Sequence, residues 1–369
     1  MDWYRRVILA PLTKGGNLPF RRLCLDFGAE VTTSEMAYAR QVNRRSRAEL
    51  ALLRKHPSEN CFGVQLAAGK PEEAVQAGMR SVEAGAAFVD LNAGCPIHDV
   101  VRRGMGAALL KRASFLARII EAMVRELPVP VTVKIRSGWK EEKVIAPEVA
   151  RLAEEAGAAA ISIHPRSRNQ RYAKAADWDL VGRLVEERSV PIIGNGDILT
   201  YFESHRLQEQ SGCASVMLAR GALIKPWLFQ EIESSRAWEP TAPERVAVYR
   251  RLANYMKEHF RDDDMGRQRA MRFLPWHLGF FWRYRPLPEA EYGELSLQHP
   301  LLQTRQSREE GLDTLEQVLR DPREDVHEKI ANVLWDAESD EDAVAKCEAL
   351  ELESQPSAFE GGEIATSHG

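Results

Sequence analysis

The segment 88–112, FVDLNAGCPIHDVVRRGMGAALLKR, carries a cysteine where a buried strand is expected to end. The apolar run from Phe88 to Leu91 is typical of a fully buried strand, and residues 92–96 interrupt it with glycine and proline. Cys95 is therefore expected at the C-terminal end of a strand. A thiol there can act as a general acid, because with a pKa of about 8.5 it is mostly protonated at neutral pH. The alternative is that Cys95 is a small buried apolar residue.

Similar apolar runs recur along the first two thirds of the chain, with amphipathic segments between most of them. We predict eight strands, at residues 7–11, 30–34, 61–66, 88–92, 129–136, 159–164, 190–194 and 214–219. Alternating strands and helices are typical of a parallel α/β domain, and eight such units favour a (β/α)8 TIM barrel. A Rossmann domain is disfavoured, because no G-x-G-x-x-G motif follows the first strand.

Residues that can bind ligands stand at the ends of these predicted strands. Ligands bind to (β/α)8 barrels at the C-terminal ends of the strands, so these residues are candidate site groups. In chain order they are Pro11, Leu12, Thr13, Glu35, Gln65, Asn92, Lys134, Arg136, His164, Arg166, Asn195, Gly196, Asp197, Ala219 and Arg220. One such residue alone is usually structural, but their recurrence at strand after strand indicates a shared ligand site.

The last two strands indicate a phosphorylated ligand. Glycines in the segments 195–197 and 219–221 leave backbone N–H groups accessible, and Arg220 adds a bidentate cation where barrels commonly hold phosphate. The alternative is that these glycines only allow tight turns. Lys134, if it faces the interior, is costly to bury unless it meets an anion. Flavin mononucleotide (FMN) meets both requirements, because it has a phosphate and an electron-rich ring.

Composition limits the other possibilities. The 369 residues, 44% of them hydrophobic, are enough for one large domain and a smaller one. The five cysteines are far apart and form no C-x-x-C pair, so we expect neither a disulfide framework nor a metal site. No run of about 20 apolar residues occurs, and the first strand begins near the N-terminus. We therefore expect a cytoplasmic protein with no membrane partner. We also expect a monomer.

Charge is distributed unevenly along the chain. Residues 336–369 contain ten acidic residues and one basic residue, a net charge of −9, which leaves +5 on residues 1–335 of a chain whose total is −4. Two basic clusters follow predicted strands and are expected to contact nucleic-acid phosphates, unless they are simply solvated surface. The first cluster lies within residues 40–55 and includes Arg44 and Arg45; the second includes Arg166, Arg168 and Arg171, with Arg136 near it.

The strand pattern stops after residue 232. The sequence Trp-Glu-Pro-Thr-Ala-Pro near residue 240 marks a domain boundary, and helical periodicity follows it. We predict a barrel domain at 1–237, an all-helical bundle at 241–335 and an acidic tail at 336–369. The tail lacks apolar periodicity and is expected to be disordered.

Seven segments resemble the tRNA-dihydrouridine synthases, most closely the group 3 branch known from eukaryotes. In the order of that family they are APLTKGGNLPFRRLC, FGVQLA, DLNAGCP with GMGAALL, VTVKIRSGW, IHPRSRNQRY, IIGNGDI and VMLARGALIKPWLF. They span about residues 7–230, and the NxGCP and RxRxQRY strings are specific. Two features depart from the family pattern. Leu12 stands where many relatives have Met, although group 3 also has Leu, and the N-terminal zinc-finger extension of eukaryotic members is absent from this sequence.

This resemblance implies an FMN enzyme that reduces the C5=C6 bond of a uridine in tRNA, with NADPH or NADH as reductant and the variable-loop uridine as target. It implies that hydride passes from flavin N5 to C6, that Cys95 protonates C5, and that the helical domain helps to bind tRNA. The residues implied to hold the flavin are Pro11, Leu12, Thr13, Gln65, Lys134, His164, Asn195, Gly196, Asp197, Ala219 and Arg220.

Three residues have more specific expected roles. Asn92, with one donor and one acceptor group, can read the edge of the uracil. Lys134 can stabilise charge on the reduced flavin near N1 and O2, and His164 either shares that task or holds the phosphate. Two other functions stay open from the residues alone. The chain can be an FMN barrel that acts on a free pyrimidine or another small enone, or a non-enzymatic RNA-binding barrel.

Overall fold

The computed structural model describes residues 2–172, 174–304 and 311–351, which form two compact units. The first unit comprises residues 2–222, 226–237 and 287–304, and the second comprises residues 223–225 and 238–286 with the described residues from 311 onward. Residues 287–304 thus pack with the first unit, although we predicted them within the helical domain. The division of the chain is therefore not a single cut near residue 240.

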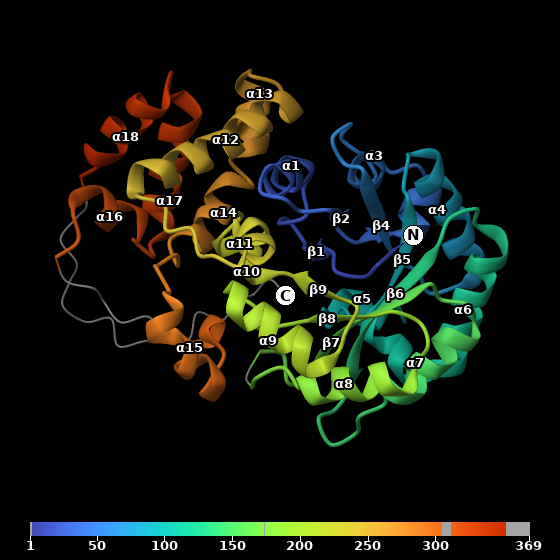
Figure 1. Ribbon diagram of the computed structural model, residues 1–369. Coiled ribbons are helices and arrows are strands. Elements are labelled where there is room, and N and C mark those ends of the chain that lie inside the picture. Colours follow the sequence, from blue (N-terminus) through green and yellow to red (C-terminus); the bar gives the residue numbers. More distant parts are fainter. Residues whose placement is uncertain (1, 173, 305–310, 352–369) are drawn as a thin grey trace. The chain divides into compact units, whose positions relative to one another are not determined.

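The first unit is a closed barrel of eight parallel strands (Figure 1). The barrel strands are β1 (Val7–Leu9), β2 (Val31–Thr33), β4 (Cys61–Ala67), β5 (Phe88–Ala93), β6 (Val131–Gly138), β7 (Ala160–Ser167), β8 (Ile192–Asn195) and β9 (Ser215–Leu218). Neighbours in the chain pair with each other, β1 pairs with β9, and β2 pairs with β4. The eight predicted strands and the TIM-barrel fold are confirmed, and each strand end lies within three residues of its predicted position.

Helices surround the barrel on its outer face (Figure 1). They are α1 (Leu18–Asp26), α4 (Pro71–Glu83), α6 (Ala113–Glu126), α7 (Ala146–Glu155), α8 (Trp178–Glu187), α9 (Tyr201–Ser211) and α11 (Leu228–Ser234). The end of the barrel at which the strands have their C-termini is called the barrel mouth. Shorter elements lie there, after the strands. They are β3 (Ala37–Tyr38), α2 (Ala39–Asn43), α3 (Arg47–Leu52), α5 (His98–Arg102), the 3-10 helix η1 (Gly106–Arg112) and α10 (Arg220–Ile224). Two elements from later in the chain, α15 (Glu289–Gln298) and the 3-10 helix η2 (Leu301–Gln303), complete the unit.

The interior of the barrel changes from apolar to polar along its axis. At the N-terminal ends of the strands, Trp3 packs edge-to-face on Phe88 with ring centroids 5.0 Å apart. Ile8, Ile193 and Met217 belong to the same apolar cluster. Successive side chains of a strand point to opposite faces, so the residues two and four positions after Phe88 share its interior face. Those residues, Asp90 and Asn92, begin the polar part of the interior.

The second unit is helical. It contains α12 (Ala242–Phe260), α13 (Asp264–Ala270), α14 (Leu274–Phe281), α16 (Thr314–Leu319), α17 (Glu324–Asp336) and α18 (Asp340–Glu348). Thr241 and Glu244 form a capping box that satisfies N–H groups at the start of α12. Tyr249 of α12 stacks on Phe281 of α14 with centroids 4.2 Å apart, and both are buried. This aromatic stack between two helices is therefore part of the core of this unit.

The expectation of a disordered tail from residue 336 is wrong for residues 340–348, which form α18. Ser339 caps this helix by accepting a hydrogen bond from the backbone N–H of Asp342. Acidic residues in its first turn are favourable at the positive end of the helix dipole. Ala343 and Cys347 are buried in the second unit. The rest of the predicted tail, residues 352–369, lies outside the described residues.

Over the part of the chain that the structure describes, the helices are all too short or too polar to span a lipid bilayer.

Candidate active site

Polar residues of neighbouring strands meet inside the barrel mouth. The strand register pairs Asn92 of β5 with Lys134 of β6, and Arg136 of β6 with His164 of β7. Because these residues alternate with core residues, they face the same interior space. The structure thus brings together residues that were predicted at separate strand ends.

The loop that carries Cys95 is held by the strands beside it. The side-chain oxygen of Asn92 accepts hydrogen bonds from the backbone N–H groups of Gly94 (3.2 Å) and Cys95 (2.9 Å). Arg136 Nε donates to the carbonyl oxygen of Gly94 at 2.8 Å. These partners belong to β5 and β6, so the barrel itself sets the conformation of the loop.

Gly106 supports the same loop from the start of η1. Its φ is +59°, and a Cβ at this position would lie 2.8 Å from the carbonyl oxygen of Cys95. The backbone N–H of Ala107 donates to that same oxygen at 3.0 Å. Only glycine combines the left-handed conformation with this close approach of two backbones.

Cys95 differs from the other four cysteines in its exposure. It is partly exposed, whereas the other four are buried. Burial raises the pKa of the Cys95 thiol, against the opposing effects of a backbone hydrogen bond at Ile97 and of the charges on Arg136 and Lys134. The thiol is therefore protonated at neutral pH, as a proton donor must be.

Asn92, which was expected to read the edge of a uracil, makes hydrogen bonds within the protein. Its Nδ2 donates to Gln65 Oε1 at 2.8 Å, while its oxygen accepts from the Cys95 loop. Gln65 Nε2 in turn donates to Asp90 Oδ2 at 2.8 Å, and Thr132 Oγ1 donates to Asp90 Oδ1 at 2.6 Å. Asp90 is buried, and burial raises the pKa of its carboxyl. A chain of hydrogen bonds thus runs from the barrel interior to the loop of Cys95.

Lys134 carries a charge that the interior disfavours. Burial, reinforced by the nearby charge of Arg136, lowers the pKa of Lys134 to about 8. Its ammonium donates to Asn195 Oδ1 at 2.9 Å, and Asn195 Nδ2 donates to the carbonyl oxygen of Met217 at 2.7 Å. An amide oxygen compensates an ammonium only partly, so this site favours an additional anion.

His164 is neutral in this arrangement. Its Nε2 lies 3.0 Å from Arg166 Nη1, and arginine can only donate, so Nε2 is the acceptor and Nδ1 carries the hydrogen. Burial and the surrounding cations, Arg136 first among them, hold the pKa of His164 well below its usual range. Arg166 also donates from Nε to the carbonyl oxygen of Lys174 at 2.7 Å. Its side chain is 0% exposed, so the prediction that Arg166 contacts RNA is wrong.

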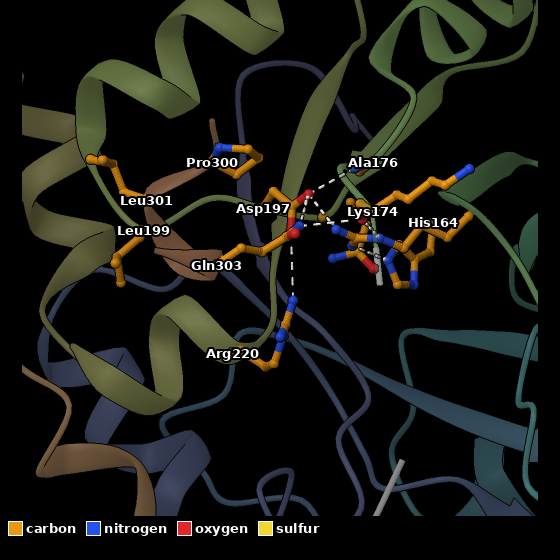
Figure 2. A network of polar contacts seen from close by, with 12 residues as sticks. His164, Lys174, Ala176, Asp197, Leu199, Arg220, Pro300, Leu301 and Gln303 are labelled. Carbon is orange, nitrogen blue, oxygen red and sulfur yellow. Dashed lines mark hydrogen bonds and ion pairs between the residues drawn. The ribbon is translucent and has the colours of Figure 1, made fainter. Parts of the chain in front are cut away.

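Asp197 connects the ends of β7, β8 and β9 (Figure 2). It has a left-handed φ of +56°, and its Oδ2 accepts from Arg166 Nη2 at 2.5 Å and from the backbone N–H of Ala176 at 2.7 Å. Its Oδ1 lies 3.5 Å from Arg220 Nη2. The Arg220 guanidinium also lies over the ring of Tyr172, 3.9 Å from its centroid, and is 20% exposed. Arg220 is thus accessible to a ligand, whereas Arg166 is not.

The remaining predicted cofactor residues lie along the same rim. Pro11 and Leu12 are half-buried and Thr13 is exposed, in the loop that follows β1. The backbone of that loop is held by Glu35 Oε2, which accepts from the Lys14 N–H at 2.6 Å. Gly196, after β8, and Ala219, after β9, are also half-buried. Gly196 has a φ of +134°, and a Cβ there would lie 3.0 Å from the Cβ of Ala176, so backbone conformation and tight packing explain this glycine.

The predicted RNA-binding cations divide by exposure. Arg44 and Arg45, next to α2, and Arg171, after β7, are exposed. Since β3 pairs with the C-terminal end of β4, the segment that begins α2 lies on the mouth side of the barrel. Arg168 is half-buried, with its guanidinium 4.9 Å from the ring centroid of Trp139. Arg136 is 5% exposed and donates to backbone carbonyls, so it supports the loop of Cys95 rather than a free phosphate contact.

Asp90, Tyr172 and Gln303 were missed as site residues. Asp90 lies two residues before Asn92 in the same strand, so alternation along β5 could have indicated it. Tyr172 follows the Arg-Asn-Gln-Arg string, but its stacking under Arg220 has no local signal. Gln303 contacts Asp197 from more than a hundred residues away in the chain. In the described ranges, no three histidine, cysteine or acidic side chains come together in a way that could bind a metal ion.

Comparison with known sequences finds a family profile and relatives that match most of this chain. The sequence profile described as dihydrouridine synthase matches residues 8–282. A tRNA-dihydrouridine(47) synthase-like protein of Homo sapiens, named as NAD(P)(+)-type, is 42% identical over 291 residues, covering 78% of this chain and 44% of that protein. A tRNA-dihydrouridine(47) synthase of Coprinopsis cinerea, also of NAD(P)(+) type, is 41% identical and covers 78% of this chain and 45% of its own length. The chain spans about half the length of these curated relatives.

Comparison with solved structures supports the fold. Histamine dehydrogenase from Rhizobium sp. 4-9 matches with a TM-score of 0.50 at 14% identity, over 68% of this chain and 49% of that chain. At this identity the likeness concerns the barrel architecture alone.

Proposed function

The chain belongs to the dihydrouridine synthase family, and from that premise we propose that it reduces the C5=C6 bond of a uridine in tRNA. The proposed cofactor is FMN, and the proposed reductant is NADPH, with NADH as the other nicotinamide. The relatives reported above are named tRNA-dihydrouridine(47) synthases. The proposed target is therefore uridine 47, in the variable loop.

The observation that carries this proposal is the position of Cys95 in the barrel mouth. Cys95 is a partly exposed residue, its thiol is protonated, and its loop is fixed by Asn92 and Arg136. Reduction of a uracil requires a proton at C5, and a thiol held beside an open site can donate it. Loss of that proton leaves a thiolate close to the charges of Arg136 and Lys134, which lower the energy of the anion.

The residues of the mouth fit an anionic flavin nucleotide. Four cations lie in the mouth, and Asp197 is the carboxylate that pairs with two of them; the four are Lys134, Arg136, Arg166 and Arg220. This excess of positive charge favours a bound anion. Arg220 and the loop after β8 follow the last two barrel strands, where barrels commonly hold phosphate. When bound, FMN supplies the hydride for C6 of the uracil.

Lys134 and His164 are proposed to have different roles. Lys134 is a cation that an anionic ring would stabilise, because an adjacent negative charge raises a depressed lysine pKa. His164 is neutral, so it contributes a hydrogen-bond donor at Nδ1 rather than a charge. We propose that Gln65, Asn195 and the backbone of residues 11–13 complete the flavin contacts, together with Gly196 and Ala219.

Exposed cations on the mouth side are proposed to bind the tRNA backbone. Arg44 and Arg45 lie next to α2, and Arg171 lies after β7, with Arg168 nearby. Phosphate contacts of this kind position an RNA without reading its sequence. The target base must leave its stack to reach a barrel interior, and these contacts can hold the strand while it does so. The helical unit is proposed to add further tRNA contacts.

The direct test is to incubate the purified protein with FMN, NADPH and unmodified tRNA and to map dihydrouridine. We expect a yellow protein that forms one dihydrouridine, at position 47, and none in a transcript with cytidine at that position. Reduction of free uracil or uridine with no reaction on tRNA would instead support a small-molecule reductase. Binding of tRNA by a protein that takes up no flavin would support a non-enzymatic RNA-binding barrel.

A second test separates the thiol from the rest of the site. Cys95→Ala should keep bound FMN and NADPH oxidation, because the flavin contacts are unchanged, but lose dihydrouridine formation by at least about a hundredfold. Cys95→Ser should also be impaired, since a hydroxyl is a far weaker acid than a thiol. Full dihydrouridine formation by Cys95→Ala would remove the thiol from the mechanism.

A further inference from the structure

The segment 287–304 packs against the barrel helix α9 even though the chain between them enters the second unit. The backbone N–H of Leu301 donates to Glu203 Oε1 at 3.0 Å. Arg206 Nη1 donates to Ser296 Oγ at 2.7 Å, and its Nη2 donates to the carbonyl oxygen of the same serine at 3.0 Å. Both Leu301 and Ser296 are buried. These contacts fix the end of the segment at the barrel mouth.

Glu203 joins this segment to the start of α9. Its Oε2 caps α9 by accepting from Thr200, and its Oε1 is the acceptor for Leu301. The carboxyl is 1% exposed, and burial raises its pKa. A buried carboxylate whose two oxygens serve different elements holds those elements in one arrangement, because loss of either partner leaves a desolvated acceptor.

Near the end of the attached segment, Gln303 contacts Asp197 (Figure 2). Gln303 Nε2 donates to Asp197 Oδ2 at 2.9 Å and lies 3.3 Å from the carbonyl oxygen of Lys174. Asp197 Oδ2 therefore accepts from three groups, namely Gln303 of η2, Arg166 of β7 and the backbone N–H of Ala176 in the loop before α8. With one oxygen fully occupied, the carboxylate has a defined orientation.

In that orientation, Asp197 also forms an ion pair with Arg220. The other oxygen of Asp197 is 3.5 Å from Arg220 Nη2. Arg166 is completely buried, so among Arg166, Asp197 and Arg220 the partly exposed guanidinium is that of Arg220. Two cations and one carboxylate leave this group with a net positive charge, and His164 beside it is neutral. An anion can reach the group through Arg220.

We propose that Gln303 is a positioning residue for a phosphate-binding site. By fixing Asp197, it holds Arg220 in place for the phosphate group of a ligand, and the segment 287–304 is thereby part of that site. The inference rests on the proposed function, in which the phosphate is the monoester of FMN. A phosphodiester of RNA has the same charged oxygens, so the test distinguishes these two sources.

The test measures ligand binding by flavin-free protein. FMN and riboflavin, which lacks the phosphate, are titrated by flavin fluorescence against wild type, Gln303→Ala, Gln303→Glu and the control Gln298→Ala. Gln298 is exposed in α15 of the same segment. Gln303→Ala should weaken FMN binding about fivefold to twentyfold and riboflavin binding less than twofold, because only the phosphate contact is affected. Gln303→Glu should weaken FMN more, since it places a second carboxylate beside Asp197.

Two further measurements keep the result unambiguous. Thermal unfolding of the flavin-free variants shows whether each variant is folded. If Gln303→Ala is unfolded, Gln303→Met takes its place in the titrations, because methionine keeps the shape of glutamine but has no hydrogen-bond donor. Binding of tRNA by the flavin-free proteins should be unchanged by Gln303→Ala.

Three outcomes overturn the inference. The first is an FMN affinity of Gln303→Ala within twofold of wild type. The second is a loss of riboflavin affinity equal to the loss of FMN affinity. The third is a loss of tRNA affinity with no loss of FMN affinity. A wild-type chain that binds neither FMN nor riboflavin refutes the proposed cofactor as well, so the two failures are distinguishable.

Discussion

The side-chain oxygen of Asn92 accepts a hydrogen bond from the backbone N–H of Cys95 at 2.9 Å. This bond attaches the proposed proton donor to the C-terminal end of strand β5. The same amide donates to Gln65, whose own amide donates to the buried carboxyl of Asp90. The position of the thiol therefore depends on hydrogen bonds among residues of the barrel interior. Its place in the mouth is a property of the barrel interior.

Asn92→Ala should slow dihydrouridine formation about tenfold to a hundredfold while FMN stays bound. The substitution leaves the N–H groups of Gly94 and Cys95 without their acceptor and Gln65 without a donor, which also costs about 1–3 kcal/mol of unfolding free energy. The rate of Cys95 alkylation by iodoacetamide should rise, because the loop is released. Asn60→Ala, at an exposed position, is the matched control. Unchanged turnover together with unchanged alkylation would show that the loop holds its conformation unaided.

Lys134→Met should change how stability depends on pH. Burial lowers the pKa of folded Lys134 to about 8, below its unfolded value, so the unfolded chain binds the extra proton between those two values. The charge penalty in the wild type is full below pH 8 and declines as pH rises toward 10.5. The advantage of Lys134→Met over wild type in unfolding free energy should therefore shrink by about 1–2 kcal/mol between pH 7.5 and 9.5.

Urea unfolding of both flavin-free proteins at the two pH values measures this difference directly. Burial raises the pKa values of Cys24, Cys213 and Cys347 in both proteins, and Lys134 does not act on these three thiols, so their contributions cancel. Added FMN should reverse the effect, because a bound anion stabilises the charged lysine. A pH-independent difference between the two proteins would mean that Lys134 has an ordinary pKa in the folded chain.

Much of this site could be predicted from the sequence because its signals are local. Apolar runs that end in polar residues gave the eight strands and placed Lys134, His164 and Asn195 at the mouth. Whether a side chain is exposed depends on partners from elsewhere, and Arg166 was misplaced for that reason. Its donors are used by Lys174, His164 and Asp197, and it cannot reach RNA.

Contacts between distant segments were beyond sequence patterns. Gln303 meets Asp197 only because the chain returns to the barrel after entering the helical unit. The segment that forms α18 was misread for a different reason. Its acidic residues indicated disorder, but behind Ser339 they occupy the first turn of a helix, where negative charge is favourable.

Arg44→Ala with Arg45→Ala should weaken tRNA binding and reduce its salt dependence. Each phosphate contact that is lost lowers the slope of log K against log salt by about 0.7–0.9. The double variant should therefore lose up to about two units of slope, with FMN content unchanged. Arg183→Ala, an exposed cation on α8, is the control. Filter binding at several salt concentrations gives the slopes, and parallel lines for wild type and the double variant would exclude phosphate contacts at these two arginines.

Gly106→Ala should impair the enzyme more than Gly104→Ala, although both glycines have positive φ values, +59° and +76°. A Cβ on Gly104 has no atom within 4 Å, so its substitution brings only the backbone strain of about 1–2 kcal/mol. A Cβ on Gly106 would lie 2.8 Å from the Cys95 carbonyl oxygen and from Val100 Cγ1, so the loop must move as well. We expect about 2–4 kcal/mol lower unfolding free energy and a loss of dihydrouridine formation beyond the loss of folded protein. Equal effects of the two substitutions on turnover, measured on folded protein, would show that the contact beneath Cys95 does not place the thiol.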